Sequence, residues 1–308
     1  MISARLPLTH AKAYKQNASF ELVACVDPSE EKRLKFQEDW SVKYSFSSTP
    51  EVLSKQLSVD IVSICSPTHL HLEHLEQALL LKPKLVFCEK PLGSDTKSSR
   101  EILERYKTLG VHLLVNYSRR FDPSVRDFKY SIDAKEYGEL RSVSGCYVKG
   151  LLNNGSHMLD LLIFLLGNIS VEYVGDACID FDKRDPSYPL FLTTDNDVSI
   201  ALSCGNSNDY SLFELEFIFS NARIKMLNGG RRWSTERVVD DKTFKGYKHL
   251  GPATFSQGRL IESFRNALVN MDDCLKDGIR LNSTGEDALN VVDLYSTIVR
   301  MAKKRNPA

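Results

Sequence analysis

The stretch Leu85-Val86-Phe87-Cys88-Glu89-Lys90-Pro91-Leu92-Gly93 decides the fold of this chain. Four apolar residues run directly into a charged pair and a proline, a pattern typical of a strand buried on both faces of a parallel sheet. Glu89 and Lys90 then stand at its carboxyl end, where open α/β sheets hold their ligands. A lysine fixed at that edge is a candidate proton donor or acceptor. A strand terminus with a surface ion pair is the alternative.

Strands and helices alternate at short spacing on both sides of this stretch, which predicts parallel βαβ units. Further strands are expected at residues 20–26, 59–65 and 111–116. From about residue 140 the strands follow one another with turn residues between them, which predicts an antiparallel sheet. Two helices, at about 257–276 and 285–303, are expected to close the chain. The predicted class is α/β: a doubly wound parallel sheet in residues 1–118, then an α+β domain in residues 119–308 with a large, mostly antiparallel sheet.

The composition excludes several classes of protein. Forty Lys and Arg residues balance forty Asp and Glu residues among 308, so no net charge attracts nucleic acid or an anionic membrane. Seven scattered cysteines without a C-x-x-C pair favour reduced thiols and a cytoplasmic location. No apolar run is long enough to span a membrane, and Met1 to His10 lack the apolar core of a signal peptide.

Polar residues follow two of the predicted strands. Asp27 ends the first, where a carboxylate can accept hydrogen bonds from an adenosine ribose and repel a 2′-phosphate, which favours NAD over NADP. An Asp-Pro turn is the alternative. The loop Ser66-Pro67-Thr68, with His71 after it, can press backbone against a flat ring. His71 and His74 share a helical face, but His69 does not converge with them and no nearby Asp, Glu or Cys completes a ligand set in register, so no metal site is predicted.

Two further segments carry candidate site residues. Asn116 ends the last parallel strand and can bond to a carboxamide, and Arg119 or Arg120 can bind a substrate carboxylate or phosphate. Pairing of these arginines with a linker acid such as Asp122 is the alternative. A very apolar helix is expected from Asn154 to Leu166.

His157 and Asp160 share a face of that helix, three residues apart, and Asn153 lies one turn before His157 if helical geometry extends that far. A histidine in the first turn of a buried helix is a candidate general acid or base. A core helix oriented by satisfied polar groups is the alternative.

Together these segments resemble the Gfo/Idh/MocA family of NAD(P)-dependent oxidoreductases, with Glu89-Lys90-Pro91 as the signature triplet. The resemblance implies a Rossmann domain, a sheet domain through which subunits form homodimers or homotetramers, and hydride transfer between a nicotinamide ring and a sugar, polyol or nucleotide sugar. It implies that Lys90 and His157 are catalytic. The implied cofactor site comprises Asp27, Ser66, Pro67, Thr68, His71, Glu89, Lys90 and Asn116, and the implied substrate site comprises Lys90, Arg119, Asn153, His157 and Asp160.

The chain departs from this family in two places. It opens in a helix at His10–Lys15, without the family's first strand and Gly-x-Gly-x-x-Gly turn. A misplaced start codon, with Met1 an internal residue, and a truncated gene product that binds sugar without catalysis are the two explanations. Asn153 stands where the family often has Asp, and because Asn cannot ionise it can orient a hydroxyl but not take its proton. A lyase or hydrolase that uses NAD transiently is a third possibility.

Overall fold

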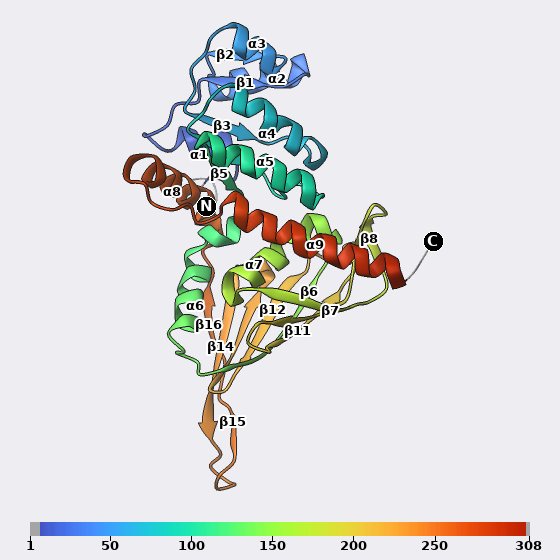
Figure 1. Cartoon of the computed structure of the whole chain (residues 1–308). Coiled ribbons are helices and arrows are strands. Elements are labelled where there is room, and N and C mark those ends of the chain that lie inside the picture. Colours follow the sequence, from blue (N-terminus) through green and yellow to red (C-terminus); the bar gives the residue numbers. More distant parts are fainter. Residues whose placement is uncertain (1–6, 306–308) are drawn as a thin grey trace. The chain divides into compact units, whose positions relative to one another are not determined.

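The computed structural model describes residues 7–305, which form two compact units (Figure 1). The first unit comprises the described residues up to Phe121 together with Ile261–Leu289, and the second comprises Asp122–Leu260 and the described residues from Asn290 onward. No helix in residues 7–305 has the length and apolar character needed to cross a bilayer. The start-codon explanation concerns Met1, which lies outside the described residues.

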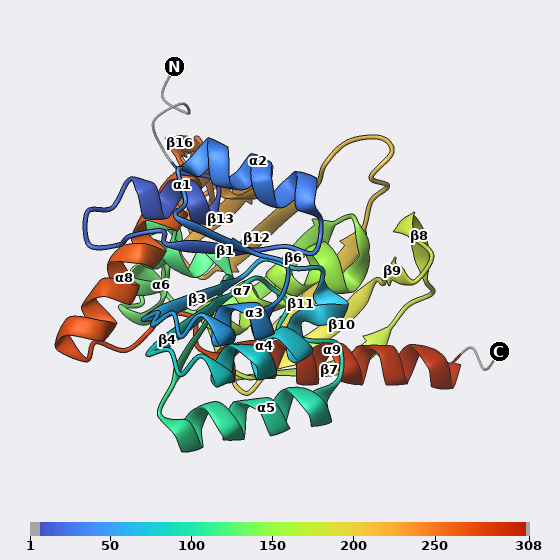
Figure 2. The ribbon, with the colours of Figure 1, turned by 90° about the horizontal axis from the view of Figure 1, so that it is seen from above.

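The first unit alternates short strands with helices along the chain (Figures 1 and 2). Its elements are α1 (His10–Lys15), β1 (Ala24–Val26), α2 (Glu30–Trp40), β2 (Tyr44–Phe46), α3 (Thr49–Ser54), β3 (Ile61–Ile64), η1 (Thr68–Leu70), α4 (His71–Leu80), β4 (Leu85–Cys88), α5 (Thr96–Leu109), β5 (His112–Val115), η2 (Ser118–Phe121), α8 (Ser263–Asp277) and the first turn of α9 (Gly285–Arg305).

Strand β4 is the centre of a three-stranded parallel sheet in the order β3-β4-β5. All four of its side chains are fully buried, as its unbroken apolar run predicts. Leu85 and Phe87 belong to a core cluster that α1 and α8 also line. Because successive side chains of a strand point to opposite faces, Val86 and Cys88 point to the face opposite that cluster.

Helix α8 extends the first unit beyond the predicted boundary. Residues 261–289 were assigned from sequence to the second domain, but they pack within the first unit. Ala267, Leu268 and Met271 are completely buried in the cluster around Leu85 and Phe87. The segment after α8 also bonds to β5, because Ser283 Oγ donates a hydrogen bond to Val115 O at 2.6 Å. These residues join the first unit because the apolar face of the β3-β4-β5 sheet is buried by a helix that is distant in sequence.

The strands of the first unit form two separate sheets. Strands β1 and β2 pair in parallel with each other, and β3, β4 and β5 form the other sheet. No strand within residues 7–305 joins the two sheets.

The second unit is built on a nine-stranded sheet (Figure 1). The strand order is β15-β14-β13-β12-β6-β11-β10-β7, with β16 also paired to β14, and only β6 and β11 run parallel. The strands are β6 (Leu140–Tyr147), β7 (Ile169–Val174), β10 (Leu190–Thr194), β11 (Ser199–Cys204), β12 (Phe213–Phe219), β13 (Ala222–Leu227), β14 (Arg232–Asp240), β15 (Lys248–Leu250) and β16 (Thr254–Gln257). The predicted large, mostly antiparallel sheet is thus confirmed.

Helices of the second unit contribute to the core over this sheet. Phe128 of α6 (Pro123–Asp133) packs against Phe217 and Trp233, with ring centroids 4.9 and 5.1 Å away. Helix α7 (Ser156–Leu166) is largely buried, and it is preceded by a π-helical turn, η3 (Gly150–Gly155). The π-turn was not predicted, because a helical pattern in sequence does not distinguish the two geometries.

A separate hairpin follows the strand β7. Strand β7 ends at Val174, and the hairpin is formed by β8 (Cys178–Asp182) and β9 (Asp185–Ser187). Gly175 lies between β7 and β8, where a side chain would press on Pro189. The expected start of the penultimate helix at 257 is wrong, because Gln257 ends β16.

We expect Met271→Ala to lower the free energy of unfolding by about 3 kcal/mol, since it removes a fully buried side chain from the first unit's core. Val269→Ala is the matched control, because Val269 lies on the same helix and is 46% exposed. Urea unfolding of both variants measures the difference. Equal, small losses would show that α8 does not belong to this core.

Candidate functional site

The carboxyl ends of β3, β4 and β5 meet around Glu89. Its backbone N–H donates to Ile64 O at 2.8 Å, and the backbone N–H of Asn116 donates to Cys88 O at 2.8 Å. Lys90 follows Glu89 and is half-buried, and the Lys90–Pro91 peptide bond is cis. The structure therefore places Glu89, Lys90 and Asn116 at one edge of the sheet, as the sequence predicted.

The Glu89 carboxylate is held by two side chains. Oε1 accepts a hydrogen bond from Asn116 Nδ2 at 2.8 Å and lies 2.9 Å from His10 Nε2. Burial alone would raise the pKa of Glu89, but the hydrogen bonds from His10 and Asn116 outweigh it and lower that pKa. Glu89 is therefore a fixed carboxylate whose charge is matched by a cation inside the protein.

His10 is the site residue that sequence reasoning missed. It is the first residue of α1, its Nδ1 lies 3.3 Å from Ser63 Oγ, and its ring lies on Phe87 with centroids 4.0 Å apart. Burial lowers its pKa, but hydrogen bonds with Cys65 and Glu89 raise it more, to about 9. Its only sequence signal was a histidine at the start of a helix, and nothing in the sequence indicated a partner 79 residues away.

A tyrosine extends this network below His10. Tyr14, also on α1, places its hydroxyl 2.8 Å from Ser63 Oγ. Burial is the main reason that the pKa of Tyr14 is raised well above its ordinary value. The hydroxyl thus stays neutral and links α1 to β3 on the same side as His10.

His71 ties two loops of the predicted cofactor site together. It is buried at the start of α4, with Nδ1 2.7 Å from Pro91 O and Nε2 2.8 Å from Ser66 O. His74 Nδ1 lies 2.8 Å from Ser66 Oγ. The loop of Ser66, Pro67 and Thr68 is therefore held directly beside the Glu89-Lys90-Pro91 segment.

Asp27 directly follows β1, as predicted. Its Oδ1 accepts the backbone N–H of Ser29 at 2.8 Å, and Ser29 in turn caps the start of α2. Arg33 on that helix donates to Asp27 O at 2.8 Å. The carboxylate is half-buried at a strand end, where an acceptor for the hydroxyls of a dinucleotide ribose is expected.

The two arginines of η2 differ in their surroundings. Arg120 is 4% exposed and forms an ion pair with Asp287 at 3.1 Å, within the first turn of α9. This is an internal ion pair between η2 and α9. Arg119 is also buried, and its substrate role stays a prediction.

The second unit carries the other predicted catalytic group. Asn153 lies in the π-turn η3 and His157 in the first turn of α7, and both side chains are half-buried. Asp160 on the same helix is 1% exposed. Lys90 belongs to the first unit and His157 to the second, so their convergence on one substrate oxygen stays a prediction.

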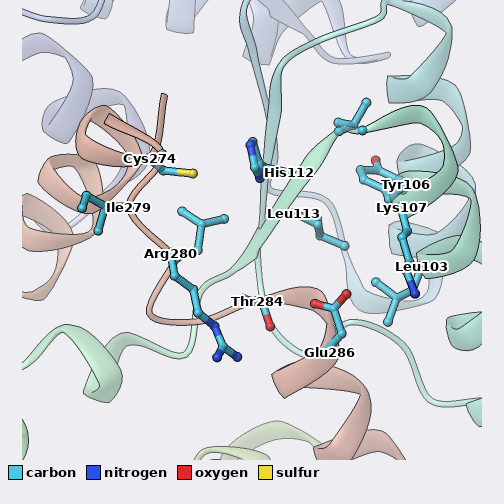
Figure 3. Close-up of a pocket in the computed structure, with 14 residues that line it drawn as sticks. Leu103, Tyr106, Lys107, His112, Leu113, Cys274, Ile279, Arg280, Thr284 and Glu286 are labelled. Atoms are coloured by element: carbon cyan, nitrogen blue, oxygen red, sulfur yellow. The ribbon is translucent and has the colours of Figure 1, made fainter. Parts of the chain in front are cut away.

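The first unit also has a depression of about 310 Å³ whose lining does not include Glu89, Lys90 or Asn116 (Figure 3). His112, at the start of β5, lines it together with Arg280, Thr284 and Glu286. This is the amino end of β5, whereas Asn116 follows its carboxyl end. The depression is therefore separate from the chemistry expected at Lys90.

The residues present fit NAD in their donor chemistry. The Asp27 carboxylate, the loop bound by His71 and the Glu89–Asn116 carboxylate–amide pair all stand at carboxyl ends of parallel strands, where open α/β sheets bind dinucleotides. Within residues 7–305, no group of three or more His, Cys, Asp or Glu side chains is arranged to hold a metal ion.

Comparison with known proteins agrees with this assignment. Residues 5–117 match the family model GFO_IDH_MocA, described as "Oxidoreductase family, NAD-binding Rossmann fold". Inositol 2-dehydrogenase of Rhizobium meliloti (strain 1021) is 25% identical over 98% of this chain and 96% of its own length. D-Glucoside 3-dehydrogenase of Escherichia coli (strain K12) is 27% identical over 58% of each protein.

Solved structures share the fold over nearly the whole chain. An oxidoreductase from Agrobacterium radiobacter in complex with NAD+, L-tartaric acid and magnesium has a TM-score of 0.78 at 14% identity, covering 96% of this chain and 93% of its own. A 3-ketoreductase from Actinomadura kijaniata in complex with NADP and TDP-benzene has a TM-score of 0.77 at 18% identity, covering 97% and 94%.

Fold and site together define an oxidoreductase with an NAD-binding Rossmann domain followed by a large antiparallel-sheet domain. Within that class, residues 5–117 match the Gfo/Idh/MocA family model and inositol 2-dehydrogenase is similar over nearly the whole chain, in agreement with the resemblance that the Glu89-Lys90-Pro91 triplet indicated. The individual roles that the resemblance gives to the site residues stay predictions.

We expect the His10–Glu89 pair to stabilise the protein at neutral pH and to lose this contribution at alkaline pH. The folded pKa of about 9 exceeds the ordinary value of 6.5, so the pair's contribution is complete below pH 6.5 and is lost as pH rises through about 9. One pKa unit corresponds to about 1.4 kcal/mol. The free energy of unfolding of the wild type should therefore exceed that of His10→Asn by about 3 kcal/mol less at pH 10 than at pH 6.

Chemical denaturation at several pH values measures this difference. His112→Asn is the control, because His112 is exposed at the other end of β5 and should show no such change. A constant gap between wild type and His10→Asn across this range would contradict a charged His10.

Proposed function

We propose that this chain is an NAD-dependent dehydrogenase that acts on a hydroxyl carbon of a polyol, sugar or nucleotide sugar. The observation that carries the proposal is the Glu89-Lys90-Pro91 segment at the carboxyl end of β4, with Glu89 fixed by His10 and Asn116. Bound nicotinamide supplies a hydride acceptor, and the residues of the chain bind and deprotonate the alcohol.

Lys90 and His157 divide the work on the alcohol oxygen in this proposal. Hydride leaves a carbinol carbon only as the hydroxyl proton is removed, so a base and a cation are both needed at the oxygen. Lys90 stabilises the developing negative charge and also contacts the nicotinamide ribose. The half-buried His157 accepts the proton, and Asn153 orients a hydroxyl as a neutral donor and acceptor.

Glu89 is fixed beside Lys90 in this arrangement. Its Oε1 accepts a hydrogen bond from Asn116 Nδ2 and lies 2.9 Å from His10 Nε2, so the charge of Glu89 is compensated inside the protein.

Names of similar proteins support the proposed substrate class. Similar proteins are named inositol 2-dehydrogenase and D-glucoside 3-dehydrogenase, and one structural relative was solved with NADP and TDP-benzene. A polyol or pyranose ring with adjacent hydroxyls suits a site with one imidazole, one amine and one amide. A homodimer or homotetramer through the antiparallel sheet remains part of the proposal, and the mass of the protein in solution tests it.

The decisive experiment combines binding and turnover. We expect NADH to bind, as measured by its fluorescence, and NAD to be reduced in the presence of myo-inositol, a D-glucoside or a nucleotide sugar. Binding of sugar without binding of NADH would support the non-catalytic alternative instead. Absence of both would sink the proposal.

We expect Lys90→Ala to lower kcat roughly 100- to 10,000-fold, since it removes the cation at the reacting oxygen. Lys84→Ala is the matched control: Lys84 stands at the other end of β4, 69% exposed and paired with Asp60. Steady-state NADH formation measures both, with NADH affinity recorded alongside. Equal turnover in the two variants would remove Lys90 from the mechanism.

A further inference from the structure

The turn that carries Asn153 is held by side chains from a distant hairpin. The first backbone N–H groups of a helix have no partner inside it, and a π-turn leaves them open in the same way. Here Lys149 N donates to Asp180 Oδ2 at 2.8 Å, and Gly150 N donates to Ser187 Oγ at 3.0 Å. Both acceptors lie on the β8–β9 hairpin.

Asp185 makes the central contact of this arrangement. Its Oδ1 accepts the N–H of Leu152 at 2.7 Å and its Oδ2 accepts the N–H of Asn153 at 2.9 Å. One carboxylate thus binds two consecutive amides of η3. Charge-assisted hydrogen bonds of this kind are stronger than neutral ones, so the backbone of Asn153 is fixed from outside its own helix.

Gly150 shows how closely the carboxylate is seated. Its φ of +78° is in the left-handed region, and a Cβ there would lie 2.2 Å from Asp185 Oδ2 and 2.5 Å from Asp185 O. Only glycine leaves room for the carboxylate at this position. The sequence of the turn is therefore fitted to Asp185.

The hairpin is itself anchored to the sheet. The Tyr147 hydroxyl accepts the N–H of Tyr188 and donates to Tyr188 O, each at 2.9 Å, next to the end of β9. Ser187 Oγ donates to Asp180 Oδ1 at 3.2 Å within the hairpin. The acceptors that hold the turn are thus connected to β6 and to each other.

We propose that Asp180, Asp185 and Ser187 form a clip that positions Asn153 and His157 for catalysis, with Asp185 as its principal positioning residue. The inference rests on the proposed function for its catalytic part. His157 stands in the turn that directly follows η3, so a shift of the Asn153 backbone moves the start of α7 as well. Asp185 acts through the backbone and does not touch the substrate.

Asp185→Asn tests the clip. An amide has one acceptor oxygen where the carboxylate has two, so one of the two N–H groups loses its partner and faces an NH₂ group. We expect amide hydrogen exchange in the peptide 148–156 to accelerate roughly 10- to 100-fold. We expect kcat per folded molecule to fall at least about 10-fold, with NADH affinity within about twofold of wild type.

Asp182→Asn is the matched control, because Asp182 lies on the same hairpin and bonds to Arg184 beside it. It should change neither exchange nor kcat. If Asp185→Asn does not fold, Ser187→Ala removes the single acceptor of Gly150 N and should give the same two changes at smaller size. Melting temperatures are recorded for all variants.

The outcomes separate the clip from the proposed function. Unchanged exchange in 148–156 overturns the clip. Faster exchange with unchanged kcat per folded molecule overturns positioning, because a purely structural role predicts only a lower melting temperature. If the wild type turns over no polyol or sugar, the proposed function fails, and the exchange measurement alone decides whether the hairpin holds the turn.

Discussion

The half-buried carboxylate of Glu89 sets the constraint on which the first unit depends. A charge at the end of an apolar strand is costly unless it is paired, and the chain pairs it with His10 and Asn116 from two other elements. The same contacts bring the end of β5 and the start of α1 to the end of β4. Lys90 is the next residue, so the contacts of Glu89 with Ile64, His10 and Asn116 also fix the backbone from which Lys90 extends.

The second unit also contains a carboxylate that is bound within the protein, but its partners are backbone groups. At Glu89 a side-chain charge is satisfied by other side chains, whereas at Asp185 it is satisfied by the backbone of the π-turn. In both places a carboxylate that is directed inward fixes the segment carrying a candidate catalytic residue. The groups expected to meet the substrate are thus adjacent to these carboxylates rather than identical with them.

Short-range patterns predicted most of the fold, and long-range pairings account for what they missed. The run from Leu85 to Cys88 identified a buried parallel strand, because hydrophobic content alone decides that case. The same logic could not place Met271 in the core of the first unit, since an amphipathic helix does not indicate which sheet it covers.

The candidate site was predicted in the same partial way. Lys90, Glu89 and Asn116 follow strand ends and could be placed by topology, because carboxyl ends of parallel strands meet at one edge. His10 has no such marker, and its role emerges only from contact with Glu89.

Asn153 is explained in part by Asp185. The family often has Asp at this position, and the backbone N–H of Asn153 already binds the Asp185 carboxylate at 2.9 Å. A second carboxylate on residue 153 would stand within a few ångströms of the first, and like charges at that distance raise each other's pKa. One of the two would then tend to hold a proton and lose its strength as an acceptor. The neutral amide of Asn153 avoids this repulsion beside the carboxylate that binds its backbone.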